Sequence, residues 1–311
     1  MRKIGRGKTF SLVYLLLLGL SAGYILLDTF VIPRRYAVIS VASVNTAETE
    51  DSQLGQAEDQ AQTADSTAQS SASFYQDARF KIEISQYRED DSDIYVADIV
   101  LSDASYLKTA LADNTFGKNI TAATSEIAQA NNAVLAINGD YYSARSGLVL
   151  RNGVLYRSAG SDSSQTDLLI QTDGTWLLKA ETDISDQWLS AQQIQQGLSF
   201  GPALLSDGQI EVGVNTEVNQ AKGQLNPRSA VGQISDLHYV MVVVDGRSST
   251  SQGVSLYQLA AFMQQLQVQT AYNLDGGGSA TLYFNGQVIN HPTSDGRVFK
   301  ERKVSDILYV G

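Results

Sequence analysis

Residues 271–279 have the sequence AYNLDGGGS, and this stretch carries the strongest structural signal in the chain. An apolar segment typical of a buried strand runs into Asp275, and three glycines follow directly. Ordering three consecutive glycines costs much conformational entropy, so they are expected where the backbone must approach another group closely. Successive N–H groups in such a turn can bind an anion. The alternative, a glycine linker, fits badly because strand-like segments flank the run on both sides.

Strand ends are where rigid scaffolds present functional groups. We therefore predict that Asp275, at the end of this strand, is a catalytic residue acting on whatever the glycine turn holds. The residues predicted to bind the substrate around it are Asn273, Gly276, Gly277, Gly278 and Ser279.

Outward from this stretch, short strand-like segments and tight-turn signals fill most of the chain after residue 80. The segments span 94–101, 133–137, 148–150, 168–171, 175–178, 239–244, 270–274, 281–284 and 307–310. Four dipeptides between strands favour the positive φ angles of hairpin turns: Asn152-Gly153, Asp173-Gly174, Asp207-Gly208 and Asn285-Gly286. Helical periodicity is rarer and is clearest over 255–266, with a second region near 120–130. The pattern predicts an α+β fold, a strand-rich mixed-sheet domain with a few covering helices.

A second polar cluster follows the strand-like segment 133–137 and consists of Asn138, Gly139, Asp140, Tyr141 and Tyr142. An Asn-Gly pair alone is typical of a hairpin turn. A carboxylate followed by two aromatic rings instead suits a sugar site, which needs an acid–base group and flat apolar surfaces. We therefore predict Asp140 as a catalytic candidate and Asn138 as a substrate ligand.

Arginines beside strand-like segments are the candidate phosphate ligands, because the planar guanidinium fork suits a pair of phosphate oxygens. Arg228 opens a strand, and Arg247 follows the strand 239–244 together with Asp245. Glu301 and Arg302 precede the last strand. We predict the three arginines as substrate ligands and the two acids as further catalytic candidates. Each has a plainer alternative: a surface position for Arg228, a simple turn at Asp245, and a solvated charge run at Glu301 and Arg302.

The N-terminal region decides the predicted compartment. Residues 9–32 form an apolar stretch of about 24 residues, and a helix needs roughly 20 to cross a bilayer core. Basic residues are more frequent before this stretch than after it, which keeps the N-terminus in the cytoplasm. The alternative is a cleaved signal peptide. We expect an uncleaved signal anchor, because apolar sequence continues past the small residues Ser21, Ala22 and Gly23.

This interpretation divides the chain into four parts. We expect a cytoplasmic tail at 1–8, a transmembrane signal anchor at 9–32, an extracellular stalk at 33–77 and a catalytic domain at 78–311. The stalk prediction rests on 45–77, where Gln, Ser, Thr, Ala and acidic residues predominate and cannot bury enough surface to offset ordering entropy. The prediction is a single-pass protein of the cell membrane with its C-terminal domain outside.

The composition excludes several classes of site. The chain has 311 residues, no cysteine and two histidines, which removes disulfides and thiol nucleophiles and makes a structural zinc site unexpected. With a formal charge of −11 and scattered basic residues, nucleic acid is not an expected partner. Oxygen ligands for a divalent cation are plentiful, but no spacing requires one. We therefore predict neither a metal nor a cofactor, and the chemistry must come from carboxylates, hydroxyls, amides and arginines.

The ordered set of motifs resembles the phosphodiester glycosidase family, from about residue 133 to the C-terminus. Besides the two clusters described above, the likeness rests on Gly201-Pro202, Arg228-Ser229-Ala230-Val231-Gly232, Asp245-Gly246-Arg247 with Gly253, and Glu301-Arg302 with Ser305-Asp306. Each fragment is weak alone, and the ordered set is specific. The chain departs from the family at Asp140, which stands where the family usually has an aromatic residue directly after Asn-Gly.

The resemblance implies a hydrolase that removes a sugar, such as N-acetylglucosamine, from a glycosyl phosphodiester. Bacterial members are often described as exopolysaccharide biosynthesis proteins, which implies a role in the cell envelope. Such a site must stabilise an anionic leaving group beside an oxocarbenium-like sugar. We expect the amides of the glycine turn and the arginines to hold the phosphate. One or two of the four carboxylates would act as base, nucleophile or acid.

Other classes remain open at this point. A non-catalytic module that binds a glycan or wall polymer would need the aromatic residues but not the carboxylates. A serine hydrolase would use Ser279 and His291, but its nucleophile turn needs Gly-x-Ser-x-Gly, and Thr281 occupies the last position. The sequence does not decide between cleavage of the C–O and the P–O bond, or between retention and inversion.

Overall fold

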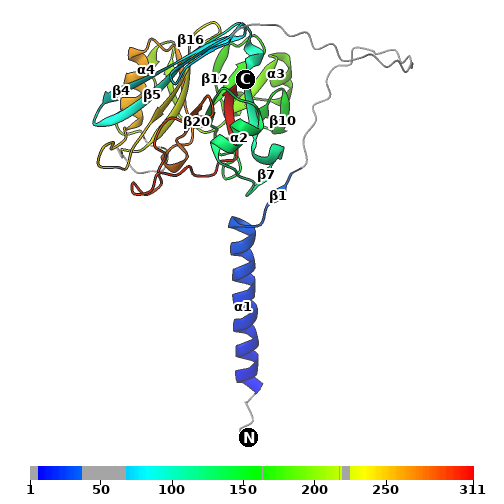
Figure 1. The fold of residues 1–311 in the computed structure, drawn as a ribbon. Helices are drawn as coiled ribbons and strands as arrows, with labels where there is room; N and C mark the ends of the chain where they lie inside the picture. Colours follow the sequence, from blue (N-terminus) through cyan, green and yellow to red (C-terminus); the bar gives the residue numbers. More distant parts are fainter. Residues whose placement is uncertain (1–5, 37–67, 163, 217, 219–224) are drawn as a thin grey trace, which may run out of the picture.

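A computed structural model describes residues 6–36, 68–162, 164–216, 218 and 225–311. Within these residues, one long helix, α1 (Arg6–Phe30), projects from a strand-rich domain (Figure 1). The predicted α+β class, with few helices and an apolar N-terminal helix, is confirmed. Most of the predicted stalk, residues 37–67, lies outside the described residues.

The largest element is a nine-stranded antiparallel sheet in the order β15-β14-β18-β16-β17-β5-β4-β3-β2. Its strands, in that order, are β15 (Gln209–Ile210), β14 (Ala203–Ser206), β18 (Thr270–Asn273), β16 (Arg228–Ser235), β17 (His238–Val244), β5 (Ser92–Leu101), β4 (Phe80–Glu89), β3 (Phe74–Gln76) and β2 (Gln69–Ser70). Strands β2 and β3 precede residue 78, so the folded sheet begins earlier than the predicted domain boundary.

Two five-stranded sheets and a two-stranded pair complete the strand structure among the described residues. The first has the order β20 (Gln287–Val288), β19 (Leu282–Phe284), β8 (Leu135–Asn138), β21 (Asp306–Val310) and β6 (Leu107–Leu111). The second has the order β10 (Val154–Arg157), β9 (Val149–Arg151), β13 (Ile194–Leu198), β11 (Thr166–Gln171) and β12 (Trp176–Ala180). The pair is β1 (Arg34–Arg35) with β7 (Gly117–Lys118).

Alternating side chains of the large sheet build a core on each of its faces. On β17, Tyr239, Met241 and Val243 belong to the cluster shared with the two five-stranded sheets. The intervening Val240 and Val242 pack with α4 (Leu256–Gln265) on the other face. This period of two is the pattern expected of a strand buried on both faces. The sheet is thus the central layer of the domain.

Shorter helices pack against the sheets, and the predicted turns are present. The helices are α2 (Thr124–Ala130), α3 (Asp186–Ala191) and α4, and single 3-10 turns span Ala104–Tyr106, Ala112–Asn114, Glu181–Asp183 and Gly277–Ser279. Ser255 caps α4 by accepting a hydrogen bond from the Gln258 amide, as its position before the helix favours. Each of the four predicted hairpin dipeptides joins paired neighbouring strands with both residues at positive φ or, in one case, with glycine at positive φ.

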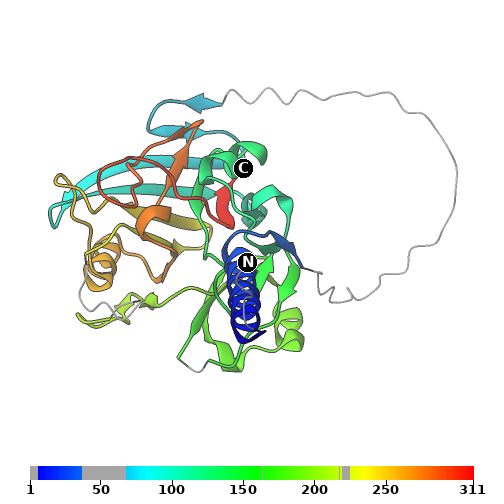
Figure 2. The same cartoon turned by 90° about the horizontal axis from the view of Figure 1, so that it is seen from below.

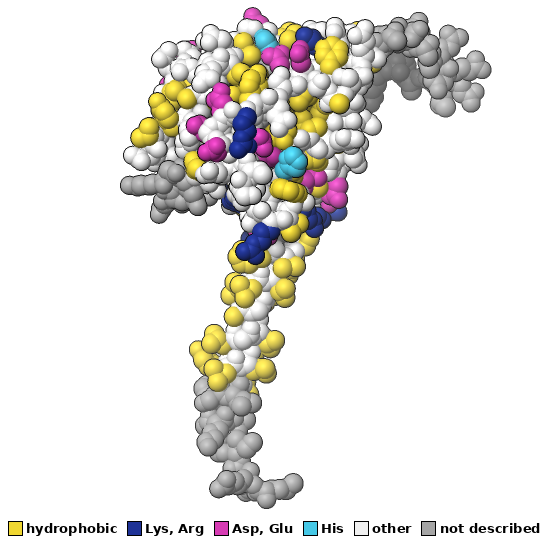
Figure 3. Space-filling view, turned by 60° about the vertical axis from the view of Figure 1, so that its left-hand side comes forward, with side chains coloured by type: hydrophobic (Ala, Val, Ile, Leu, Met, Phe, Trp, Pro, Cys, Tyr) yellow, Lys and Arg dark blue, Asp and Glu magenta, His cyan; other side chains and the backbone are white. Residues whose placement is uncertain are grey.

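The long helix α1 makes little contact with the domain along its length. Its segment Val13–Phe30 has a mean hydropathy of 1.8 and is long and apolar enough to cross a membrane. Figure 3 shows hydrophobic side chains along this helix and basic side chains where it meets the domain. At that junction Asn119 Nδ2 donates to the carbonyl oxygens of Thr29 (3.3 Å) and Ile32 (3.0 Å). Together with the β1–β7 pair, these bonds join the end of α1 to the domain.

Candidate active site

Three of the predicted clusters meet where β8 and β18 end. Asn138 is fully buried, and its Nδ2 donates to the Asp275 carbonyl oxygen at 2.6 Å. Its Oδ1 accepts from Ser229 Oγ at 2.7 Å, and the Asp275 amide donates to the Gly139 carbonyl at 3.3 Å. The side-chain amide of Asn138 can bind both segments at once because it carries a donor and an acceptor. The segments around residues 138, 229 and 275, far apart in the chain, are therefore held at one place. The Asn138-Gly139 pair is not a hairpin turn, since β8 pairs with β19 and β21.

The glycines after Asp275 allow close approach of other backbone segments. A Cβ on Gly276 would lie 2.7 Å from the Pro227 carbonyl oxygen, and Gly277 has a φ of +61°. A Cβ on Gly278 would collide with Ser294. The Gly277 amide donates to the Pro227 carbonyl at 2.8 Å, so this N–H is engaged within the protein. The glycines thus pack the turn against two neighbouring loops. Because the Gly277 N–H is engaged within the protein, at most some of the successive N–H groups predicted to bind an anion face a ligand.

A cavity of about 350 Å³ opens beside this turn. It is lined by Tyr141, Ala144, Arg145, Phe200, Val218, Asn226, Arg228, Arg247, Asn273, Leu274, Asp275, Gly276, Gly277 and Arg302. Its size is within the range of small-molecule sites. Seven of the thirteen predicted site residues are among these lining residues: Arg228, Arg247, Asn273, Asp275, Gly276, Gly277 and Arg302.

The carboxylate of Asp275 faces the guanidinium of Arg302 in this cavity. Arg302 Nη2 lies 2.8 Å from Asp275 Oδ2 and 3.1 Å from the Gly276 carbonyl oxygen, and Nε donates to Ser279 Oγ at 2.8 Å. The side chain of Asp275 is 11% exposed and that of Arg302 is 43% exposed. Arg302 is thus held by three acceptors, and it fixes the orientation of the one carboxylate among the described lining residues.

Three further arginines give the cavity a positive charge. Arg247 Nη1 donates to the Ser294 carbonyl at 2.9 Å, and Nη2 to Asn226 Oδ1 at 3.2 Å. Burial lowers the pKa of Arg247, and the charge of Arg302 lowers it further. Arg228 is 6% exposed, with Nε on the Val254 carbonyl at 3.0 Å. With Arg145, the cavity has four guanidinium groups against the Asp275 carboxylate, although the chain has a net charge of −11.

Two aromatic rings contribute to the cavity wall. Tyr141 lies in the left-handed region with φ of +57°, and its ring is 6.0 Å from the Arg302 guanidinium carbon. Phe200 is largely buried, and the Arg145 guanidinium carbon lies 4.2 Å from its ring centre. Tyr142, which we expected to act with Tyr141, is buried in the core and stacks on Phe116. Only the first of the two adjacent tyrosines therefore lines the cavity.

Asp140 lies in the interior and outside the cavity lining. Its Oδ1 is 2.8 Å from Arg151 Nη2, and its Oδ2 accepts from the Ser199 amide at 2.9 Å. Arg151 also binds Asp306, so one guanidinium serves two buried carboxylates. Burial, and then the charge of Asp140, raises the pKa of Asp306 to about 7. The structure gives Asp140 a place in a buried ion-pair network.

The other two predicted acids also lie outside the cavity lining. Asp245 accepts from Asn290 Nδ2 at 2.9 Å and from the His291 amide at 3.0 Å, and burial raises its pKa. Glu301 accepts a hydrogen bond at 3.0 Å from the amide of Ser125, a residue in the first turn of α2. Asp245 is thus held by a loop and Glu301 by the first turn of a helix. Asp275 is therefore the predicted acid that faces the cavity.

The remaining predicted residues lie behind the cavity wall. Asn138 supports the Asp275 carbonyl, Ser279 accepts from Arg302, and Gly278 packs on Ser294. His291 Nδ1 lies 3.2 Å from Asp245 Oδ2. Ser279 and His291 therefore have different partners, which does not favour a serine hydrolase.

Sequence reasoning did not find several lining residues. Arg145 and Ala144 lie in the loop after the two tyrosines, and Phe200 directly precedes the Gly201-Pro202 pair. Asn226 precedes Pro227, and that proline stiffens the approach to Arg228. The Asn226-Pro227-Arg228 sequence was therefore a local signal for a residue near the site. Arg145 and Phe200 do not belong to any of the polar clusters at strand ends from which the other residues were predicted.

A protein-family model described as phosphodiester glycosidase matches residues 131–311, which is more than half of the chain. The chain belongs to the phosphodiester glycosidase family. All fourteen lining residues fall within the matched region.

The curated relatives that match this family member are distant. It is 29% identical over 201 residues to the SPbeta prophage-derived uncharacterized protein YomE of Bacillus subtilis, covering 63% of this chain and 30% of that protein. It is 28% identical over 209 residues to the bovine N-acetylglucosamine-1-phosphodiester alpha-N-acetylglucosaminidase, covering 61% of this chain and 39% of that protein. The chain thus spans well under half the length of these relatives.

A solved structure supports the fold of the phosphodiester glycosidase domain. The catalytic domain of the zebrafish N-acetylglucosamine-1-phosphodiester alpha-N-acetylglucosaminidase, auto-inhibited by its pro-peptide, aligns with a TM-score of 0.60 at 23% identity. The alignment covers 74% of this chain and 82% of that one. A hypothetical protein from Synechocystis aligns with a TM-score of 0.54 at 14% identity, covering 75% and 62%. At these identities the likeness concerns the fold.

Within the described residues, no group of three or more His, Cys, Asp or Glu side chains is arranged to hold a metal ion. The cavity of this family member instead combines one oriented carboxylate, several guanidinium groups and two aromatic faces. A cluster of cations can hold a phosphate, and a carboxylate beside it can act on a neighbouring carbon.

Proposed function

We propose that the chain hydrolyses a glycosyl phosphodiester, with N-acetylglucosamine as the candidate sugar, outside a membrane to which α1 anchors it. The observation that carries the proposal is the pairing of one carboxylate, Asp275, with a cluster of arginines in a single cavity of the family domain. A phosphodiester brings one negative charge, which the arginines neutralise. The aromatic rings of Tyr141 and Phe200 offer flat surfaces for the sugar.

The proposed reaction breaks the bond between the anomeric carbon and the phosphate oxygen. Asp275 acts at the anomeric carbon, either removing a proton from the attacking water or attacking the carbon itself before water replaces it. The products are the free sugar and a phosphate monoester, and the second hydrogen of the water is released as a proton. A phosphate leaving group needs little protonation, so one carboxylate suffices where most glycosidases use two.

Three of the four lining arginines have a defined part in this proposal. Arg302, fixed by Ser279 and Gly276, orients Asp275. Arg228 and Arg247 hold the phosphate oxygens, and the charge that develops on the leaving oxygen is stabilised by groups already in position. Arg247 is itself held by Asn226 and Ser294, so its guanidinium needs little reorganisation.

The substrate class and the anchoring are further parts of the proposal. Family membership and the N-acetylglucosaminidase relatives support a glycosyl phosphodiester, and a compound of the cell envelope fits an outward-facing domain. The apolar α1 supports a single-pass anchor with the domain outside, and a signal peptide passes the same test of length and composition.

The test is turnover of N-acetylglucosamine-1-phosphodiesters by Asp275→Asn. We expect at least a thousandfold loss with unchanged folding by circular dichroism, because the amide is neither base nor nucleophile. Asp245→Asn is the matched control, since this buried acid lies outside the cavity lining; its loss should be less than tenfold. Equal loss in both variants would remove Asp275 from its proposed role. If the unmodified chain binds the substrate but does not turn it over, the result would favour a non-catalytic binding module.

A further inference from the structure

A short loop at the rim of the cavity exposes two large apolar side chains. Val298 is 61% exposed and Phe299 is 58% exposed. Adjacent residues this exposed are unusual in the domain, whose other apolar side chains are mostly buried. Exposed apolar pairs on a protruding loop are typical of surfaces that contact a membrane or a partner.

The loop is well ordered by its own polar groups, so the exposure is a property of its structure. Thr293 Oγ1 donates to the Val298 carbonyl at 2.8 Å and accepts from the Gly296 amide at 2.9 Å. Asp295 Oδ1 accepts from the amides of Arg297 (2.9 Å) and Val298 (3.1 Å). These bonds close a tight turn and leave both apolar side chains more than half exposed, although the Phe299 ring lies 5.3 Å from the His291 ring.

Basic side chains surround the apolar pair. Arg297, Lys300 and Lys303 are exposed in the same segment. Of the two acids there, Asp295 is bound to turn amides and Glu301 to Ser125. An apolar tip flanked by cations complements an anionic lipid surface, into which the apolar groups insert while the cations contact headgroups.

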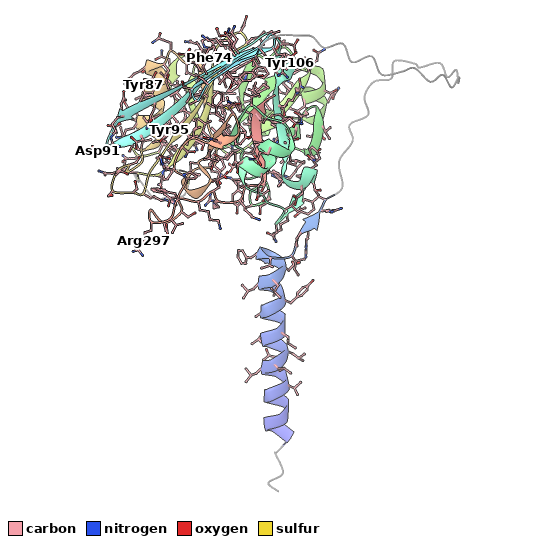
Figure 4. All side chains as sticks on the ribbon, viewed as in Figure 1. Phe74, Tyr87, Asp91, Tyr95, Tyr106 and Arg297 are labelled. Atoms are coloured by element: carbon pink, nitrogen blue, oxygen red, sulfur yellow. The ribbon has the colours of Figure 1, made fainter. Side chains whose placement is uncertain are left out.

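The loop also lies on the side of the domain from which α1 projects. Figure 4 labels Arg297 at that end, whereas Tyr106 and Phe74 lie at the opposite end. Seen from below in Figure 2, the orange-to-red segment after β19 is not covered by α1. Arg34, Arg35 and Lys118 are at the same end, where β1 pairs with β7.

The loop is continuous with the cavity. The Ser294 carbonyl accepts from Arg247, and Ser294 packs on Gly278. Arg302, which pairs with Asp275, follows the apolar pair by three residues. Contact of this loop with a bilayer would therefore place the cavity mouth at the lipid surface.

We propose that the loop around Val298 and Phe299 docks on an anionic bilayer and presents the cavity to glycosyl phosphodiesters whose alcohol is a membrane lipid. The proposal rests on the proposed function and on α1 as the anchor. A domain joined to the helix end through β1 and Asn119 needs no long reach to make this contact.

The first experiment uses the full chain in vesicles of phosphatidylcholine and phosphatidylglycerol. Because the chain has no cysteine, Val298→Cys can be labelled at one site with an environment-sensitive dye. Val100→Cys is the control; Val100 is 42% exposed near the end of β5 that leads to Tyr106, on the far side from α1. Spin-labelled lipid headgroups should quench the dye at least threefold more at 298 than at 100. Equal quenching would overturn the proposal.

The second experiment compares two substrates with the same sugar phosphate, one esterified to a lipid in the vesicle and one to a water-soluble alcohol. Val298→Asp should lower the rate on the lipid substrate at least tenfold and leave the soluble substrate within twofold. An equal fall on both would overturn the proposal. If the dye is quenched but neither substrate is cleaved by the unmodified chain, the proposed function fails while the membrane contact stands.

Discussion

The ion pair between Arg302 and Asp275 allows the clearest separation of catalysis from stability. Replacing Arg302 by Met removes the guanidinium that lies 2.8 Å from Asp275 Oδ2 and 2.8 Å from Ser279 Oγ, and keeps most of the apolar stem. The side chain of Arg302 is 43% exposed, so water screens the pair. We expect the unfolding free energy to fall by less than about 1 kcal/mol.

The effect on catalysis should be larger, because the guanidinium orients the carboxylate in the transition state. Loss of one charge-assisted hydrogen bond costs about 1.5–3 kcal/mol, which corresponds to a roughly 10- to 150-fold lower kcat/KM. Arg302→Lys should fall in between, since an ammonium keeps the charge but cannot bind Asp275 and Ser279 as a fork.

The assay is kcat/KM on a soluble glycosyl phosphodiester together with urea unfolding of the same samples. Arg88→Met is the matched control, because Arg88 pairs with Asp93 at 3.0 Å and lies outside the cavity lining. Activity of Arg302→Met within twofold of the unmodified chain would refute the orienting role. The orienting role would also be refuted if the variant were so unstable that its smaller folded fraction accounted for the whole loss of activity.

Three further changes test the site and the core. Gly276→Ala places a methyl group 2.7 Å from the Pro227 carbonyl and should lower stability by about 1–3 kcal/mol and activity at least tenfold, while Gly213→Ala, whose Cβ has room, should change neither. Tyr141→Ala should raise KM about 3- to 10-fold if its ring supports the sugar, with Tyr257→Ala on α4 as an inert control; an unchanged KM would remove Tyr141 from the sugar site. Burial raises the pKa of Asp167 to about 7, so the folded state binds a proton that the unfolded chain releases near pH 4, and the unfolding free energy should fall as pH rises from about 4 to 7. Asp167→Asn should flatten this dependence by up to about 4 kcal/mol in urea titrations at pH 4.5 and 7.5, and an identical slope in both proteins would contradict the assignment.

Much of the strand framework could be predicted, because alternation and turn chemistry are local. β17 and β21 stand out as apolar runs, and the Asn285-Gly286 pair marks the hairpin between β19 and β20. Strand β13 was not predicted, because its sequence is polar. Its buried Gln196 is explained only by partners distant in sequence, accepting from Thr109 Oγ1 at 2.7 Å and donating to Asn152 Oδ1 at 2.8 Å.

The candidate site was predictable where a polar residue lies at the end of a strand or just beyond it, as at Asn273 and Asp275. Which acids face the cavity was not predictable, because that depends on partners elsewhere in the chain. Asp140 has the same local setting as Asp275, but Arg151 on β9 draws it into the interior. Arg145 was missed for the same reason, since its place in the cavity depends on Phe200.

The central claim is that the cavity holds a glycosyl phosphodiester and that the bond to the anomeric carbon breaks. The most direct measurement is hydrolysis of N-acetylglucosamine-1-phosphodiester in water enriched in oxygen-18, followed by mass spectrometry of both products. We predict that the label enters the sugar and that the phosphate monoester stays unlabelled. Label in the phosphate monoester would show attack at phosphorus and contradict the account.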